Sequence, residues 1–139
     1  MNSYLSCNLC TAVNEEYRIV KKTDEAYAII PLHPLVEGHV MILPKRHALL
    51  EELTAKELVE LRDLVIILKN KLIDLYPERP PQLITDMNTF HASIPEHFHY
   101  HLVPNTYNFR TLLAAHDPAI PRKKEAVRSE LEKMAKMLR

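Results

Sequence analysis

The sequence predicts an α+β fold in which an antiparallel sheet packs against one long helix. Short runs of β-branched and aromatic residues recur along the chain, separated by residues that favour turns. One long segment after Thr54 repeats apolar residues every three or four positions, as an amphipathic helix does. A length of 139 residues suits one domain with its own core, so we expect a single domain over residues 1–139.

The first three strands are predicted in the N-terminal third of the chain. Two short strands are expected over 17–21 and 25–30, joined by a polar connection of hairpin length. Pro31 and Pro34 exclude regular structure in the next segment. Gly38, the only glycine in the chain, opens a third strand over 39–43 that ends at Pro44.

The long helix begins with a capping signal. The run from Thr54 to Glu57 has the Thr-x-x-Glu form, in which two side chains satisfy backbone N–H groups at a helix start. We interpret this helix as a core element without chemistry, because its apolar residues form one stripe: Leu58, Leu61, Val65, Leu68 and Leu72. Prolines at 77, 80 and 81 end it.

The remaining elements are two strands and a terminal helix. The strands are expected over 83–87 and 97–103, and the helix over 119–139, after Pro118 and Pro121. Within the single domain we therefore distinguish a C-terminal helical extension over 118–139. Residues 1–16 form an N-terminal segment that carries the two cysteines.

The charge balance limits the partners. The formal net charge is +0, and the basic bias after Arg122 is typical of a solvated helix face, so we expect no nucleic-acid partner. The apolar runs are too short to cross a bilayer, and the N-terminus lacks the basic start and apolar core of a signal peptide. We expect a cytoplasmic protein with no membrane partner.

The segment from His97 to Pro104 is the strongest chemical signal in the chain. His97, His99 and His101 alternate with apolar or aromatic residues, so an extended backbone places the three imidazoles on one face. A single histidine is most often structural, but three in strict alternation predict a functional site. Imidazole can act as a nucleophile, a general acid or base, or a metal ligand.

Cys7 and Cys10 form a second signal, Cys-Asn-Leu-Cys. In a reducing compartment such a pair serves as metal ligands, as free thiols or in redox chemistry. A redox pair of the thioredoxin type follows a strand, and no strand is predicted before Cys7. We expect half of a zinc site, with the other ligands among the eight histidines.

Two motifs in this order resemble the histidine-triad (HIT) family. The triad segment fits the signature His-x-His-x-His-x-x, and the run from Gly38 to His47 is similar to the family's Gly-His, apolar run, Pro-Lys-x-His. The resemblance covers roughly residues 7–108. It implies a HIT-like fold and a homodimer.

The resemblance also implies an activity. HIT hydrolases act on nucleoside phosphoramidates, dinucleoside polyphosphates or related conjugates through a covalent nucleotidyl-histidine, and release a nucleoside monophosphate. His99, the middle histidine of the triad, would be the nucleophile. His101 would orient it and hold phosphate oxygens, and His39 would belong to the proton network.

Zinc-bearing relatives, including galactose-1-phosphate uridylyltransferase, suggest the ligand set. They pair an N-terminal CxxC with the histidine after the Pro-Lys turn and with the first triad histidine. Carried over to this sequence, the ligands of a closed structural zinc site would be Cys7, Cys10, His47 and His97.

Two departures from the family pattern keep alternatives open. Pro31 stands where the family usually has an acidic residue or Asn for the ribose, and the segment before the triad lacks glycine. Asn88 and Ser93 are the remaining polar candidates for substrate binding. The alternatives are a nucleotide-binding module with little or no turnover, and a metal-dependent hydrolase with the triad histidines as ligands.

Overall fold

The computed structural model describes residues 7–85, 97–104 and 126–139. They contain a five-stranded antiparallel sheet in the order β1-β2-β3-β5-β4. The predicted class, α+β with an antiparallel sheet and one long helix, is confirmed. The strands are β1 (Ile19–Lys22), β2 (Ala26–Ile29), β3 (Val40–Pro44), β4 (Pro81–Ile84) and β5 (Tyr100–Pro104).

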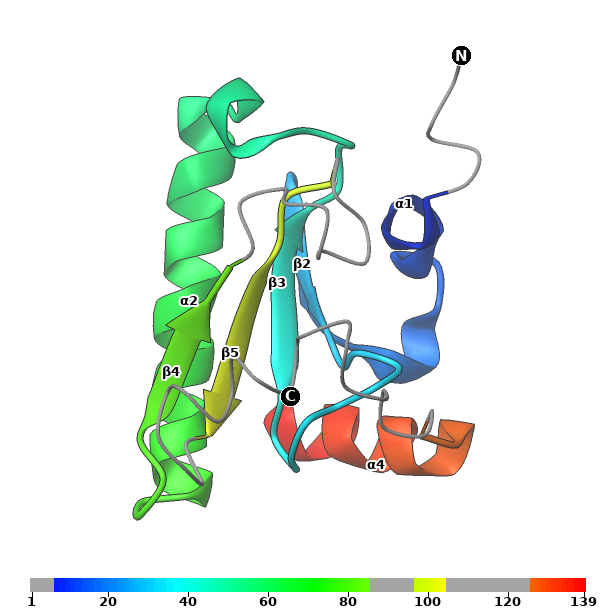
Figure 1. Ribbon diagram of the computed structural model, residues 1–139, viewed down its shortest axis with the longest axis vertical. Coiled ribbons are helices and arrows are strands. Elements are labelled where there is room, and N and C mark those ends of the chain that lie inside the picture. The colour runs from blue at the N-terminus through cyan, green and yellow to red at the C-terminus, as the bar shows by residue number, and fades with distance from the viewer. Residues whose placement is uncertain (1–6, 86–96, 105–125) are drawn as a thin grey trace, which may run out of the picture.

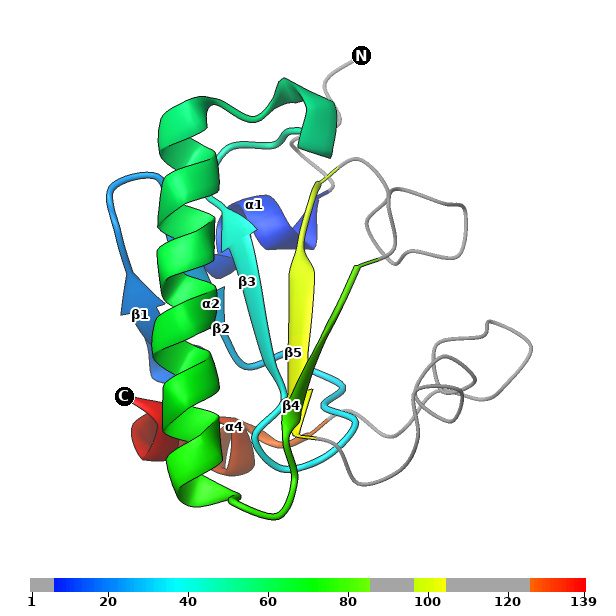
Figure 2. The same cartoon turned by 90° about the vertical axis from the view of Figure 1, so that its left-hand side faces the viewer.

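Helices cover both faces of the sheet (Figures 1 and 2). The long helix α2 (Ala55–Leu75) and the C-terminal helix α4 (Arg128–Leu138) pack on one face with the larger apolar core. The short helix α1 (Asn8–Ala12) packs on the other face with a smaller core. Two short 3-10 helices, η2 (Glu16–Arg18) and η3 (Leu50–Glu52), precede β1 and α2.

The alternation of side chains along β5 is the one predicted from the sequence. Phe98 and Leu102 are buried in the core beneath α2, and Tyr100 packs against that core. His101 pairs with Met41 of β3, which belongs to the core beneath α1. The triad strand therefore presents histidines to the face of the sheet that carries α1.

Helix α2 begins as predicted, but its buried stripe is shifted. The hydroxyl of Thr54 accepts a hydrogen bond from the Glu57 amide, and a Glu57 carboxylate oxygen accepts one from the Thr54 amide. Leu58 is 44% exposed, so its assignment to the buried stripe is wrong, whereas Val65 is partly buried and packs against the core. The apolar run from 64 to 68 fits more than one helical phase. The buried residues are Glu57, Leu61, Leu64, Leu68 and Leu72.

The start of β1 differs from the predicted strand. Tyr17 and Arg18 lie in η2 instead, where the buried Arg18 guanidinium donates to the carbonyl of Ile30. The backbone still pairs with the neighbouring segment there, because the amide of Ile30 donates to the carbonyl of Arg18 at 3.0 Å.

Other boundaries also differ from the sequence prediction. Strand β3 begins at Val40 rather than at 39, and β5 begins at Tyr100 rather than at 97. Strand β4 begins at Pro81 rather than at 83, because proline is tolerated as the first residue of an edge strand. Helix α4 begins at Arg128, and residues 119–125 of the helix predicted over 119–139 lie outside the described residues. The preceding Val127 is extended, and the amide of Ala126 bonds to the carbonyl of Leu32.

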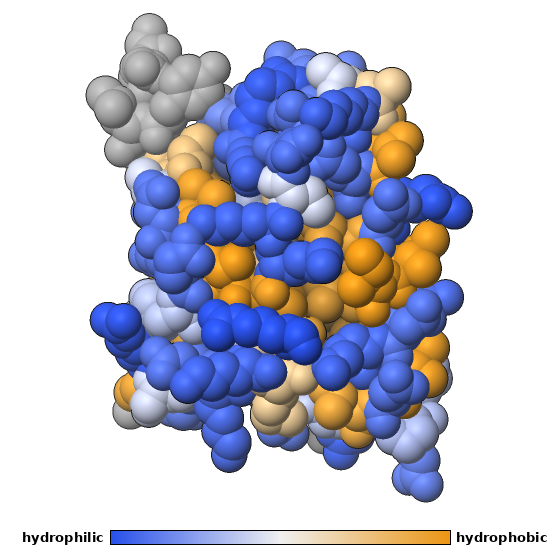
Figure 3. Space-filling view, turned by 180° about the vertical axis from the view of Figure 1, so that it is seen from behind, coloured by the Kyte–Doolittle hydropathy of each residue, from blue (hydrophilic) through white to orange (hydrophobic). Residues whose placement is uncertain are grey.

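Several large apolar side chains reach the surface between charged ones, as the view from behind illustrates (Figure 3). Those on α2 with the greatest exposure are Leu58, Val59, Ile67, Ile73 and Leu75. Within the described ranges, no helix has both the length and the apolar character needed to span a bilayer.

Gly38 is required at the turn before β3. Its φ is +91°, and a Cβ there would lie 2.8 Å from side-chain carbons of both Pro104 and Tyr76. We expect Gly38→Ala to lower the free energy of unfolding by about 2–4 kcal/mol, through backbone strain and overlap. Urea unfolding measures this change, and a loss below about 0.5 kcal/mol would contradict the role of the turn.

Candidate functional site

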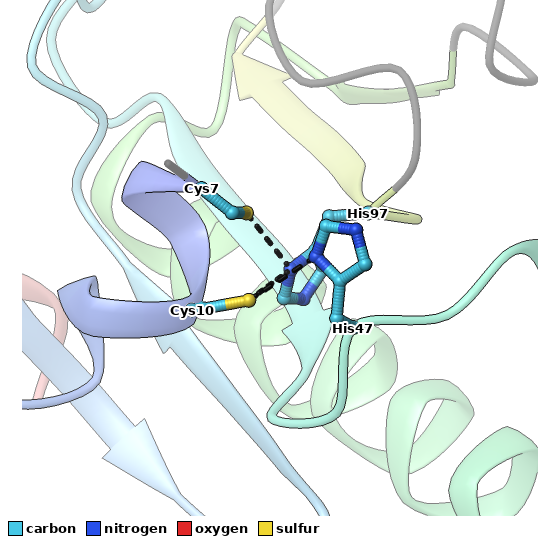
Figure 4. A group of neighbouring side chains, drawn as sticks. All are labelled: Cys7, Cys10, His47 and His97. Atoms are coloured by element: carbon cyan, nitrogen blue, oxygen red, sulfur yellow. Dashed lines mark hydrogen bonds between the residues drawn. The ribbon is translucent and has the colours of Figure 1, made fainter. Parts of the chain in front are cut away.

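Four predicted metal ligands converge on one point (Figure 4). Cys7 caps α1 and Cys10 lies within it, His47 follows β3, and His97 precedes β5. The Cys10 Sγ lies 3.1 Å from His47 Nδ1 and 3.5 Å from His97 Nδ1, and the Cys7 Sγ lies 3.4 Å from His97 Nδ1. All four ligand atoms lie within 4.8 Å of one another.

The three sulfur-to-nitrogen distances, from 3.1 to 3.5 Å, are close to those around a tetrahedral zinc ion. Zinc bonds of about 2.3 Å to sulfur and about 2.0 Å to nitrogen place neighbouring ligand atoms roughly 3.3–3.8 Å apart. The donor set, two thiols and two imidazoles, is one that closed structural zinc sites use. The residues present therefore fit a structural zinc.

The protonation of His97 prepares its ring as a ligand. Its Nε2 donates to the carbonyl of Pro44 at 2.8 Å, so in the neutral ring the lone pair lies on Nδ1, which faces the thiols. Burial lowers the pKa of His97 to about 4, which keeps the ring neutral. Without a metal, burial and the neighbouring Cys7 raise the pKa of Cys10 to about 12. A bound cation would displace that thiol proton.

Buried hydrogen bonds fix the elements that carry these ligands. The hydroxyl of Tyr27 in β2 donates to the carbonyl of Leu9 at 2.6 Å and anchors α1 to the sheet. Burial raises the pKa of this phenol, so it remains a donor. The amide of Phe98 donates to the carbonyl of Ala48 at 2.8 Å, which ties the triad segment to the loop of His47.

His99 is oriented by the backbone of its own strand. Its Nδ1 donates to the carbonyl of His97 at 2.8 Å, which leaves the lone pair of the neutral ring on Nε2. The hydroxyl of Thr85, the residue after β4, donates to the carbonyl of His99 at 2.8 Å and so fixes the backbone just before β5. An imidazole fixed in this tautomer can act as a nucleophile through Nε2.

A chain of hydrogen bonds sets the tautomers of the other two histidines. The amide of Leu35 donates to His39 Nδ1 at 3.0 Å, so the proton of the neutral His39 ring is on Nε2. His39 Nε2 lies 2.8 Å from His101 Nδ1 and donates to it, which leaves the His101 proton on Nε2. The His101 ring lies 5.1 Å from the His99 ring between centroids.

The triad histidines have separate roles in this geometry. His97 belongs to the group that could hold a metal, and among the described residues that group includes neither His99 nor His101. The Nδ1 atoms of the latter two are engaged by the His97 carbonyl and by His39. The arrangement therefore does not favour a metal-dependent hydrolase with all three as ligands.

Two predicted site residues cannot be placed in the structure, and two groups at the site were not predicted from the sequence. Asn88 and Ser93, predicted to contact substrate, lie outside the described residues. Sequence reasoning missed the Leu35 amide and the Thr85 hydroxyl. A backbone donor has no residue-type signal, and a threonine at a strand end is common in any sheet.

Comparisons with known proteins agree with the fold. Adenosine 5'-monophosphoramidase from Candida albicans is 27% identical over 112 residues, which cover 75% of this chain and 73% of that protein. A hypothetical histidine triad nucleotide-binding protein from Sulfolobus tokodaii superposes with a TM-score of 0.72 at 22% identity, covering 95% of this chain and 89% of that one.

A zinc-bound histidine triad family protein from Mycobacterium smegmatis superposes with a TM-score of 0.67 at 16% identity, covering 97% of this chain and 94% of that one. Residues 1–115 match the family described as "protein similar to CwfJ C-terminal". This match covers most of the chain, and the HIT resemblance predicted from the two motifs is confirmed. The chain has the histidine-triad fold and belongs to the family of proteins similar to the CwfJ C-terminal region.

Proposed function

We propose that this protein is a nucleotidyl hydrolase that works through a covalent nucleotidyl-histidine on His99. Its substrates would be nucleoside phosphoramidates, dinucleoside polyphosphates or related conjugates, and its product a nucleoside monophosphate. The observation that carries the proposal is the tautomer of His99, whose Nδ1 is held by the His97 carbonyl so that Nε2 has the lone pair. The similarity to an adenosine monophosphoramidase supports it.

In the first step, the His99 Nε2 lone pair attacks the α-phosphorus and forms an N–P bond. The P–N or P–O bond to the leaving group breaks, and the leaving group departs with the electron pair and takes up a proton. The Nε2–H of His101 would donate to a phosphate oxygen as negative charge grows there. The positive charge on His99 is stabilised by the Nδ1–H bond to the His97 carbonyl.

In the second step, water adds to phosphorus and the N–P bond breaks. The electron pair returns to His99 Nε2, the water loses a proton, and the monophosphate leaves. A two-step route suits imidazole because it is both a good nucleophile and a good leaving group.

A bound zinc would serve as a structural cross-link between segments that are distant in the sequence. Cys7, Cys10, His47 and His97 would hold it, joining α1 and the loop after β3 to the triad strand. By fixing His97, it would fix the carbonyl that orients His99. No chemical step passes through the ion.

The direct test is to incubate the protein with adenosine phosphoramidate and, separately, with a diadenosine polyphosphate, and to follow AMP by chromatography. We expect AMP from at least one of them. A nucleotide-binding module is the second candidate, because Pro31 is buried and offers no polar group to a ribose. Tight nucleotide binding without AMP release over hours would favour that module over the hydrolase.

We also propose that the protein is a cytoplasmic homodimer, joined along the edge of the sheet at β4. Strand β4 pairs only with β5 among the described strands, and its Leu83 is 46% exposed. In the cytoplasm the thiols of Cys7 and Cys10 stay reduced and able to bind metal.

Leu83→Lys is expected to convert the dimer to a monomer, because it places a charge on this edge. Sedimentation equilibrium measures the mass of both forms. A wild-type protein that sediments as a monomer, or a variant that remains a dimer, would contradict this interface.

A further inference from the structure

The loop that carries His47 has contacts on two sides of the sheet. On one side His47 points towards the thiols of α1 (Figure 4). On the other side the guanidinium of the neighbouring Arg46 reaches Glu57 in the first turn of α2. The loop is thus held between the candidate metal group and the first turn of the long helix.

Glu57 is the partner of Arg46 and is 1% exposed. One carboxylate oxygen of Glu57 accepts from Arg46 Nη2 at 2.9 Å, and the other accepts from Arg46 Nε at 3.2 Å. The same Nη2 also donates to the carbonyl of Glu52 at 2.7 Å. The guanidinium therefore bridges the end of η3 and the first turn of α2.

The charge of Glu57 is not needed for the helix cap. The capping box is satisfied by Glu or Gln, since only one side-chain oxygen must accept from the Thr54 amide. A buried carboxylate costs free energy unless it is paired. The specific partner of the negative charge is Arg46, whose hydrogen bond lowers the pKa of Glu57. The carboxylate and guanidinium thus form a two-point clamp on the residue next to His47.

We propose that Arg46 and Glu57 are positioning residues for the metal site, because their ion pair fixes the loop so that His47 Nδ1 points at the thiols. This inference rests on the zinc site of the proposed function. The family motif Pro-Lys-x-His leaves position 46 unassigned, and α2 was expected to carry no chemistry. Residues that orient metal ligands typically change metal affinity 10–100-fold when replaced.

The test is a zinc titration against a chromophoric chelator, with the metal-free wild type, Arg46→Gln and Glu57→Gln. We expect both variants to bind zinc about 10–100-fold more weakly than the wild type. Cobalt(II) supplies a second readout, because its visible spectrum reports coordination geometry. We expect the tetrahedral bands of the wild type to weaken in both variants at saturating cobalt.

Thr54→Ala is the matched control. It removes the other half of the same capping box and lowers the melting temperature, but it leaves the Glu57 carboxylate and its bonds to Arg46 in place. We expect its zinc affinity to stay within about threefold of the wild type, because the clamp on the loop is intact.

The outcomes separate the two proposals. If the wild type binds no zinc, the site itself is wrong and the inference falls with it. If the wild type binds zinc and Arg46→Gln binds it equally well with the same cobalt spectrum, the positioning role is overturned and the zinc site stands. If Glu57→Gln does not fold, Arg46→Gln decides, since the Arg46 side chain is 48% exposed and its removal leaves no cavity.

Discussion

His99→Ala is expected to lower kcat/KM for AMP release by about 10⁴-fold or more, because it removes the nucleophile rather than a supporting contact. The backbone hydrogen bonds of the strand around His99 do not depend on this side chain, so we expect the variant to fold. Initial rates with adenosine phosphoramidate measure the effect, and thermal melting checks the fold.

Tyr100→Phe is the matched control for this variant. Tyr100 is the next residue in the strand, but it packs against the core beneath α2, on the opposite face of the sheet. We expect Tyr100→Phe to keep turnover within about threefold of the wild type, because the Tyr100 side chain contacts neither the His99 ring nor the hydrogen-bonded pair of His39 and His101. A folded His99→Ala protein that still releases AMP at the wild-type rate would show that another group performs the attack.

The double variant Cys7→Ser, Cys10→Ser is expected to bind no stoichiometric zinc, since it loses both sulfur ligands. Zinc at 1,000 times its Kd stabilises a folded protein by about 4 kcal/mol, and the variant would lose this contribution. Metal analysis and urea unfolding with and without zinc measure the two effects. The metal-free wild type is the control, and we expect it to unfold near the variant.

The same variant connects the metal site to catalysis. In this variant His97 loses the ion and both thiol contacts at Nδ1 and keeps its hydrogen bond to Pro44, so the carbonyl that orients His99 is less well fixed. We expect kcat to fall about 10–100-fold, well short of the loss in His99→Ala. Wild-type stability and turnover that are both indifferent to zinc removal would contradict the cross-link.

The elements with strong local patterns could be predicted from the sequence. The alternation of His97, His99 and His101 set their common face, and the Thr54 and Glu57 spacing located the start of α2. The ligand set came from a resemblance. The structure brings the four side chains together, although up to 90 positions separate them along the chain.

Other features depend on tertiary contacts that no local pattern records. The phase of α2 was ambiguous because its apolar run is continuous, and packing against the sheet selected Leu64 over Leu58. Arg46 has the pattern of a solvated turn residue until α2 places Glu57 beside it. The Leu35 amide that sets the tautomer of His39 is a backbone group, and its role depends on the turn before His39.

The most direct test of the central claim is to look for adenylate bound to His99 during turnover. The zinc-loaded protein is mixed with adenosine phosphoramidate, stopped within milliseconds at alkaline pH, where phosphoramidate bonds survive, and measured as intact protein by mass spectrometry. We predict an adduct of one adenylyl group, mapped to the peptide that contains His99 and missing from His99→Ala. AMP release with no adduct at any time, or an equal adduct on His99→Ala, would contradict the account.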